Sequence, residues 1–185
     1  SGDKDNFCDE NSPLNPLSLY ARDKVDVESQ LMEFDNATSF RLATVFGISP
    51  RMRLDLLVNN FVYRALTDKF VILFEGHFKR NYVHVKDVCE AFCFAIENQE
   101  KVKGEIFNFG LTEANISKQE LCYAIQAQLP EFTFIDAPLA KDPDQRNYIV
   151  SNQKIEDKGM KARISLDYGI SELIKGLQMF EQYPF

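Results

Sequence analysis

The sequence predicts an α/β fold with parallel strands. Short segments rich in β-branched and aromatic residues alternate with longer segments whose apolar residues recur every three or four positions. This alternation is typical of parallel strands joined by helices. Helical and extended segments are nearly balanced, which excludes an all-α or an all-β fold. At 185 residues, of which 45% are hydrophobic, the chain is long enough to bury a core.

Capping and turn residues mark the ends of the predicted helices and strands, taken here in chain order. After a polar, turn-rich start over 1–16, Ser18 is a suitable N-cap for the first helix and Ser117 for a later one. Gly47 and Gly110 each follow a β-rich run and end it. The predicted helices cover 19–34, 54–66, 88–96, 118–129, 154–158 and 166–180. The predicted strands cover 40–46, 70–74, 82–85, 105–109, 132–135 and 148–150.

Net charge and hydropathy exclude several classes of protein. The 28 acidic residues outnumber the 21 basic ones and give a net charge of −7. This charge argues against a nucleic-acid binder and against a protein held on an anionic membrane surface. No apolar run approaches the roughly 18–20 residues of a membrane span, and the first residues contain no apolar signal core. We therefore expect a soluble, cytoplasmic protein.

The cysteines and histidines do not suggest a metal site. Four cysteines occur without a CxxC pair, and there are only two histidines, so a zinc site is not expected. Cys89 and Cys93 are four residues apart and share one face of the predicted helix over 88–96. We interpret the four cysteines as reduced thiols of the core, which fits a reducing compartment.

A glycine-rich phosphate cradle is absent from these 185 residues. The eight glycines occupy positions 2, 47, 76, 104, 110, 159, 169 and 176. No three of them form GxGxxG, GxxGxxG or GxxxxGK, the patterns that bring a backbone close to phosphate groups. A nicotinamide cofactor would therefore need a cradle from sequence outside this chain.

Tyr20 and Lys24 form a YxxxK pair that can share one chemical site. On a helix, residues four apart lie about 5–6 Å from each other, whereas in the second YxxxK copy, which begins on a strand at Tyr82, four steps span about 13 Å. An ammonium group beside a phenol favours the phenolate, so Tyr20 can act as a general base toward a hydroxyl. The alternative is a structural pair, in which Lys24 extends its ammonium to solvent beside a core tyrosine.

Five segments carry a family resemblance. They are Asp9–Lys24, Phe40–Gly47 (FRLATVFG), Arg80–Val88 (RNYVHVKDV), Gly104–Gly110 (GEIFNFG) and Asp144–Tyr148 (DQRNY). The first is similar to the segment that contains a catalytic tyrosine and lysine, and the third to an RDYVHVDDV stretch. In order and spacing, nearly the whole chain resembles the carboxyl-terminal part of the extended short-chain dehydrogenase/reductases, the NAD-dependent nucleotide-sugar epimerases and dehydratases.

The resemblance implies a fold and a division into domains. The fold is the trailing part of a doubly wound, Rossmann-like parallel sheet plus a small α/β substrate domain, with the glycine-rich cofactor half absent. Residues 1–47 and about 70–110 are expected in the Rossmann-like part, and about 48–69 and 111–185 in the substrate domain. The family's glycine-rich turn and catalytic Ser or Thr would lie upstream of residue 1, so we expect a fragment. A homodimer is possible.

The resemblance also implies an activity. Tyr20 would take the proton of a sugar hydroxyl while NAD accepts hydride from the same carbon, and Lys24 would hold the nicotinamide ribose. Both residues would therefore contact the cofactor. The expected function is an NAD-dependent nucleotide-sugar epimerase, or the related dehydratase. The alternative is a catalytically inert fragment or a non-catalytic relative that acts by binding.

Further residues are expected to bind the nucleotide sugar. Arginine suits a diphosphate because its planar fork binds phosphate with two hydrogen bonds. The resemblance and the composition of the loops indicate Thr44, Arg53, Asn60, Arg80, Asp144, Arg146 and Tyr148. Arg51 forms a doublet with Arg53 that could contact phosphate or lie in a solvated loop, and Asn59 lies with Asn60 near the family's substrate-contacting helix. For Arg80 the structural alternative is a salt bridge, for example to Asp87. Arg41 is equally compatible with a structural salt bridge, and His84 is expected to be packed and hydrogen-bonded rather than catalytic.

Overall fold

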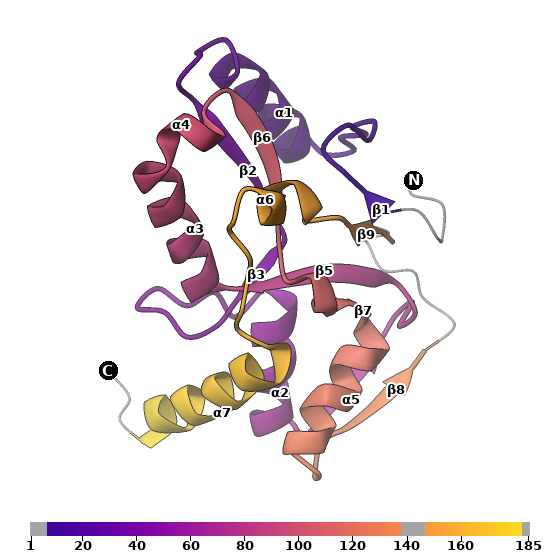
Figure 1. Ribbon diagram of the computed structural model, residues 1–185. Coiled ribbons are helices and arrows are strands. Elements are labelled where there is room, and N and C mark those ends of the chain that lie inside the picture. The colour runs from indigo at the N-terminus through magenta and orange to yellow at the C-terminus, as the bar shows by residue number, and fades with distance from the viewer. Residues whose placement is uncertain (1–6, 138–146, 183–185) are drawn as a thin grey trace.

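The computed structural model describes residues 7–137 and 147–182, which form an α/β fold (Figure 1). Its helices are α1 Leu19–Leu31, α2 Leu57–Thr67, α3 Val85–Glu97, α4 Gln99–Val102, α5 Lys118–Gln128, α6 Gln153–Asp157 and α7 Leu166–Gln182, with a 3-10 turn at Thr112–Ala114. Its strands are β1 Phe7–Cys8, β2 Thr38–Leu42, β3 Thr44–Phe46, β4 Phe70–Leu73, β5 Lys79–His84, β6 Glu105–Phe109, β7 Asn115–Ser117, β8 Thr133–Asp136 and β9 Ile149–Val150. The predicted fold class is confirmed, and β1, α4 and β7 are additions to the predicted elements.

Most of the described strands pair in parallel, as the sequence predicts. β1 pairs with β9, β2 with β6, β3 with β5 and β4 with β8, all in parallel. β7 differs, because it runs antiparallel to the first residues of β5. In Figure 1, β5 crosses the middle of the molecule, with α1, β2 and β6 on one side and α2, α5 and α7 on the other.

The run over 40–46, predicted as one strand, is divided between two strand pairs. β2 pairs with β6, and the N–H of Ala43 still donates to the carbonyl of Phe109 at 2.9 Å. β3 then turns to β5, with Thr44 opposite Tyr82. The prediction of a single strand was wrong because pairing depends on strands that are remote in sequence. The switch brings Thr44 beside β5.

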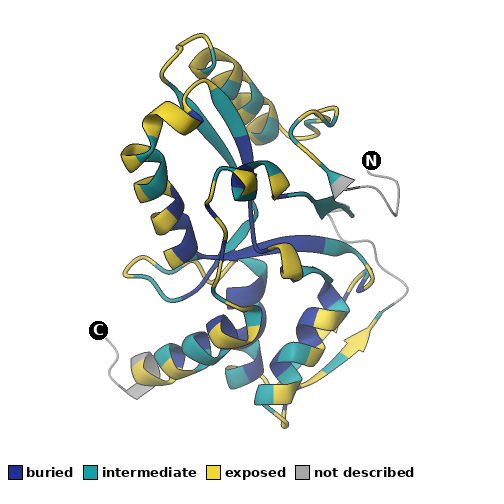
Figure 2. Ribbon diagram, in the orientation of Figure 1, coloured by how far each residue is buried: buried dark blue, intermediate teal, exposed yellow. Residues whose placement is uncertain are grey.

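The core lies between β5 and the helices on one side of it. Tyr82 and Val83 of β5 belong to one buried cluster with Val58 of α2, Leu121 of α5 and Leu173 of α7, each fully buried. Figure 2 shows β5 and the facing sides of these helices in dark blue. The core fixes β5 along most of its length, and Arg80, which is only 4% exposed, lies on this buried strand.

His84 joins β5, α3 and α7. Its Nδ1 accepts a hydrogen bond from the backbone N–H of Lys86 at 3.3 Å, so the imidazole caps α3. Its Nε2 lies 2.8 Å from the Glu172 carboxylate of α7, which also binds the Lys86 ammonium. Gly47 allows this packing, since a Cβ there would lie 2.6 Å from Nε2 and its φ is +122°. His84 is fully buried, so the interpretation of a packed, hydrogen-bonded histidine is confirmed.

Helix α1 lies on the surface, and none of its residues is buried. Residues at helical spacing form one largely apolar stripe on this part of the chain, and all of them are exposed: Leu17, Tyr20, Lys24, Val27 and Leu31. The Glu28 carboxylate holds α1 to the sheet by accepting two hydrogen bonds from Arg41 of β2, at 2.7 and 2.9 Å. Arg41 is therefore the structural salt-bridge partner that the sequence allowed. Lys24 needs no buried partner, because its stripe faces solvent in the described chain.

The cysteines only partly follow the expectation of core thiols. Cys122 is buried, and burial raises the pKa of its thiol to about 12. Cys89 and Cys93 are exposed on α3, which corrects the prediction for this pair, and Cys8 is half-buried. The face of α3 that these two cysteines share is turned outward, whereas Val88 and Ala91 face the core. Within the described ranges, no helix is both long and apolar enough to cross a membrane.

Candidate functional site

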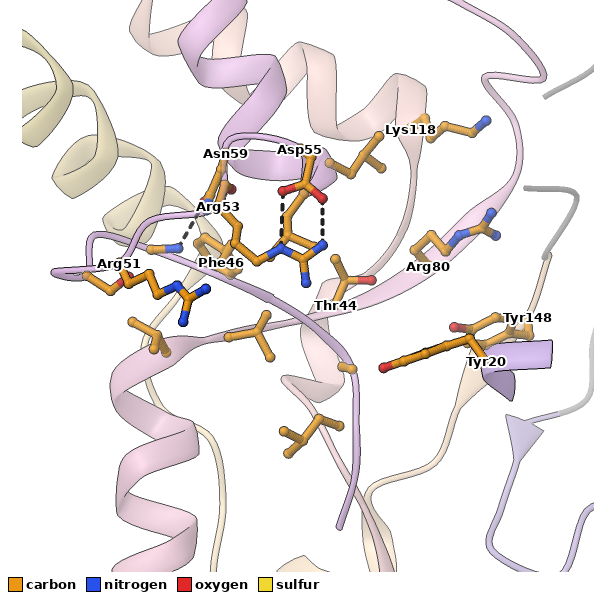
Figure 3. A pocket seen from close by; sticks show the side chains of 18 residues that line it. Tyr20, Thr44, Phe46, Arg51, Arg53, Asp55, Asn59, Arg80, Lys118 and Tyr148 are labelled. Carbon is orange, nitrogen blue, oxygen red and sulfur yellow. Dashed lines mark hydrogen bonds and ion pairs between the residues drawn. The ribbon is translucent and has the colours of Figure 1, made fainter. Parts of the chain in front are cut away.

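A cleft of about 780 Å³ runs from the carboxyl end of β2, at Leu42, along β3 to Gly47, and Arg80 from the amino end of β5 also lines it (Figure 3). The end of the cleft at Leu42 lies at the carboxyl end of a parallel strand, where α/β sheets bind ligands. Several segments far apart in sequence contribute to it, including α1, the loop between β3 and α2, β5, the start of α5 and the segment before β9. The lining residues are Tyr20, Leu42, Ala43, Thr44, Val45, Phe46, Gly47, Ser49, Arg51, Arg53, Asp55, Leu56, Leu57, Asn59, Arg80, Val85, Lys118 and Tyr148.

Tyr20 enters the cleft from the first turn of α1. The helix begins here because the Ser18 hydroxyl accepts a hydrogen bond from the N–H of Ala21 at 3.1 Å. The Tyr20 side chain is 71% exposed, and in Figure 3 its hydroxyl points toward the middle of the cleft. The Lys24 ammonium lies 5.5 Å from the centre of the Tyr20 ring, as the helical spacing predicts. Lys24 itself is not among the residues that line the cleft.

Arg53 and Asp55 form an ion pair on the loop between β3 and α2. Arg53 donates two hydrogen bonds to Asp55, from Nε to Oδ1 at 3.1 Å and from Nη2 to Oδ2 at 2.5 Å. The hydrogen bond from Arg53 holds the pKa of the Asp55 carboxyl below its ordinary value. Figure 3 shows the pair above Thr44, facing the cleft. The cleft thus contains an ionised carboxylate as well as cations.

Asn59, rather than Asn60, supports this loop. The buried Asn59 accepts a hydrogen bond from the N–H of Gly47 at 3.1 Å and donates one to the carbonyl of Arg53 at 3.0 Å. Asn60 donates to the carbonyl of Leu54 and does not line the cleft. Helical spacing contained a signal for this difference, because Asn59 borders the apolar face of α2 while Asn60 lies opposite it.

Arg80 and Tyr148 meet on the β5 side of the cleft. The guanidinium carbon of Arg80 lies 5.8 Å from the centre of the Tyr148 ring. Tyr148 is held there by its neighbour Asn147, whose side chain accepts a hydrogen bond from the N–H of Lys79 at 3.0 Å. The Asp87 carboxylate, the partner suggested for Arg80 as a structural alternative, accepts the backbone N–H groups of residues 163 and 164 instead.

Lys118 is a cleft residue that sequence reasoning missed. It is only 3% exposed, and its ammonium donates to the carbonyl of Phe74 at 2.6 Å and lies 5.6 Å from the centre of the Phe78 ring. A lysine directly after the N-cap Ser117 opposes the helix dipole, which favours acidic residues at that end. This unfavourable position was the signal in the sequence that could have identified Lys118.

Five of the nine predicted site residues line one cleft. They are Tyr20, Thr44, Arg53, Arg80 and Tyr148. Lys24 lies beside Tyr20 but outside the lining, and Asn60 lies outside it as well. Asp144 and Arg146 fall outside the described residues. The arrangement offers a phenol, several cations, aromatic rings and one carboxylate, which suits an elongated anionic ligand with hydroxyl groups.

A family model and curated relatives match the chain. The model of the NAD dependent epimerase/dehydratase family matches residues 2–110. An uncharacterized protein of Schizosaccharomyces pombe is 25% identical over 210 residues, a match that covers 93% of this chain and 56% of that protein. The chain therefore spans little more than half the length of this relative.

Solved structures of similar fold cover nearly the whole chain. The UDP-glucuronic acid 4-epimerase of Bacillus cereus, in complex with UDP-glucuronic acid and NAD, gives a TM-score of 0.82 at 20% identity, covering 97% of this chain and 58% of its own. The UDP-glucose 4-epimerase of Thermus thermophilus, in complex with NAD, gives 0.80 at 23%, covering 96% and 59%. The dTDP-glucose 4,6-dehydratase of Bacillus anthracis, also with NAD, gives 0.78 at 21%, covering 99% and 58%. At these identities the similarity shows the fold.

Proposed function

Because the chain belongs to the NAD dependent epimerase/dehydratase family, we propose that it supplies the substrate cleft and the proton-transfer residue of a nucleotide-sugar epimerase. One observation carries the proposal: Tyr20 reaches into a cleft that also contains Arg51, Arg53, Arg80 and Lys118. A chain of net charge −7 has to concentrate cations locally in order to bind a nucleotide diphosphate.

In this proposal the two sides of the cleft bind different parts of the substrate. Arg80, with Tyr148 against its guanidinium, binds the diphosphate, since charged hydrogen bonds to phosphate are the strong ones. The sugar then extends toward Thr44 and the loop between β3 and α2. Its reacting hydroxyl lies at the phenol oxygen of Tyr20, which takes the hydroxyl proton as a general base.

The exposed face of α1 fits the cofactor that the family uses. Tyr20 and Lys24 are both exposed, and the ammonium lies 5.5 Å from the phenol ring, so a nicotinamide ribose can reach both. Lys24 would hold this ribose through hydrogen bonds from its ammonium. Bound NAD would supply the hydride acceptor, and its pyrophosphate would need a glycine-rich cradle that the 185 residues do not contain.

Tyr20→Phe tests the proposal in the natural protein that contains these residues. Incubation with NAD and UDP-glucose should give the C4 epimer, detected by NMR, and the variant should lose about 10²–10⁴-fold in turnover, the usual contribution of a general base. Its melting temperature should not change, because the side chain is 71% exposed. Tyr168→Phe, on α7 and 58% exposed, is the matched control. A dehydrated keto sugar as product would identify the related dehydratase instead.

The assignment would be wrong if Tyr20→Phe kept turnover within a few-fold of the natural protein.

We also propose that residues 1–47 and about 70–110 form the Rossmann-like part and that about 48–69 and 111–185 form the substrate domain. The position of Tyr20 on α1 and of Lys118 on α5, at opposite sides of the cleft, supports a substrate bound between these two parts.

A further inference from the structure

We propose that Asp55, held by Arg53, makes the cleft selective for nucleotide-linked sugars with neutral hydroxylated substituents over those with a carboxylate. The inference rests on the proposed function and specifies its substrate class. Arg53 and Asp55 both line the cleft that Tyr20 enters. A sugar bound in this cleft would therefore contact the charged groups of both residues.

Asp55 already occupies the Nε edge of the Arg53 guanidinium. A planar guanidinium binds one carboxylate through two parallel hydrogen bonds. Arg53 makes both of these bonds to Asp55, at 3.1 and 2.5 Å. A carboxylate on the substrate would therefore have to displace Asp55 from this edge, or bind at the Nη1 edge close to the negative charge of Asp55.

The ion pair is held at a fixed place by its backbone. The carbonyl of Arg53 accepts a hydrogen bond from Asn59 at 3.0 Å, and the same Asn59 side chain accepts the N–H of Gly47 at 3.1 Å. Asn59 is only 2% exposed, so these two bonds lie in the core and not in solvent. The loop is thereby joined both to α2 and to the end of β3.

The position of the pair relative to Tyr20 identifies the part of the sugar that it meets. Figure 3 shows the Tyr20 hydroxyl pointing away from Arg80 and Tyr148, toward the part of the cleft below Thr44 and Arg53. The phenol of Tyr20 also contributes, after Asp55, to the raised pKa of the Arg53 guanidinium. With the diphosphate at Arg80 and the reacting hydroxyl at Tyr20, the sugar substituents farthest from the diphosphate reach Arg53 and Asp55.

An ionised Asp55 favours sugar substituents with neutral hydroxyls over a substituent with a carboxylate. A carboxylate oxygen accepts hydrogen bonds from sugar hydroxyls, whereas it repels a second carboxylate. Arg53 holds the pKa of Asp55 below its ordinary value, so the carboxylate stays ionised at neutral pH. Arg51, on the same loop and exposed, lines the cleft as well and is the competing candidate for binding a sugar carboxylate.

Calorimetric titration of the natural protein with UDP-glucose and UDP-glucuronic acid, which differ only in the oxidation of one sugar carbon, tests the inference. UDP-glucose should bind about tenfold more tightly, and Asp55→Asn should reduce this ratio by about tenfold, because a charged hydrogen bond and a like-charge repulsion have this magnitude. The reduction should come mainly from tighter binding of UDP-glucuronic acid, since Arg53 becomes available to it.

Asp68→Asn is the matched control. Asp68, the C-cap of α2, also forms a surface ion pair, with Arg64 at 3.0 Å, and does not line the cleft, so the ratio should not change. Asp55→Ser provides a second variant without the carboxylate if Asp55→Asn does not fold. Equal or tighter binding of UDP-glucuronic acid by the natural protein would overturn the inference and assign the site to Arg51. An unchanged ratio in both Asp55 variants would overturn it too.

A further titration is needed to distinguish a failure of the proposed function from a failure of the selectivity of Asp55. Titration with UDP alone serves this purpose, because UDP contacts the Arg80 side of the cleft and not Asp55. If neither UDP nor either nucleotide sugar bound, the cleft would not be a nucleotide-sugar site and the inference would fail with it. If UDP bound but the two sugars did not differ, only the selectivity of Asp55 would be excluded.

Discussion

Individual side chains of this chain are held in defined protonation states by their neighbours. His84 is the clearest case, because its Nδ1 accepts the N–H of Lys86 and Nε2 must then carry the proton toward Glu172. A protonated imidazole has no free lone pair at Nδ1 and would lose its role as the cap of α3. Burial lowers the pKa of His84, although the Glu172 carboxylate opposes this effect.

This environment predicts that the chain is less stable in mild acid. The pKa of His84 is lower in the folded chain than its value of about 6.5 in an unfolded one. Its stabilising contribution is therefore complete above about pH 6.5 and decreases as the pH falls below that value. Urea unfolding at pH 7.5 and 5.5 should show a lower free energy of unfolding at pH 5.5.

His84→Asn should remove most of this difference between the two pH values. His77→Asn should not, since His77 is exposed before β5 and is the other histidine of the sequence. The pKa of Glu172 is also lowered, so its contribution is lost only at a more acidic pH, below about 4.3. Equal stability at pH 7.5 and 5.5 in the natural sequence would contradict the role given to His84.

At the scale of elements, the loop between β3 and α2 depends on one buried side chain. Asn59→Ala removes the acceptor of the Gly47 N–H and the donor to the Arg53 carbonyl. Leaving such buried groups without partners costs about 1–3 kcal/mol. We therefore expect Asn59→Ala to lower the free energy of unfolding by about this amount in urea denaturation.

Asn60→Ala is the control for this prediction. Asn60 makes a single hydrogen bond, to the carbonyl of Leu54, in a more exposed setting. Its loss should therefore cost less than about 1 kcal/mol. If the two alanine variants were equally stable, Asn59 would not anchor the loop, and the fixed position of Arg53 and Asp55 would lose its explanation.

For the whole molecule, we predict that the 185-residue chain by itself does not bind NAD tightly. The exposed face of α1 offers Tyr20 and Lys24 to a ligand, but the sequence contains no glycine-rich turn for a pyrophosphate. Calorimetry should give a dissociation constant no tighter than about 1 mM, which corresponds to only about 4 kcal/mol. Titration with UDP under the same conditions is the control, and micromolar binding of NAD would show that the chain has a cradle of another kind.

The sequence by itself determined the α/β class, the places of the helices other than α4, and the shared face of Tyr20 and Lys24. These features depend on short-range physics: Ser18 and Ser117 accept hydrogen bonds from amides three residues later, and helical spacing brings residues four apart together. The packing of His84 was also predictable, from its position on an apolar strand.

Only the tertiary structure decided how the segments meet. The run over 40–46 divides because β6 and β5, remote in sequence, pair with its two halves. Lys118 and Asn59 line the same cleft because α5 packs against β7 and α2 against β3. The Arg53–Asp55 ion pair likewise faces Tyr20 only because the chain changes its partner strand, from β6 at β2 to β5 at β3. Contacts of this kind depend on segments far apart in the chain, and local sequence patterns carry no information about which of them will be neighbours.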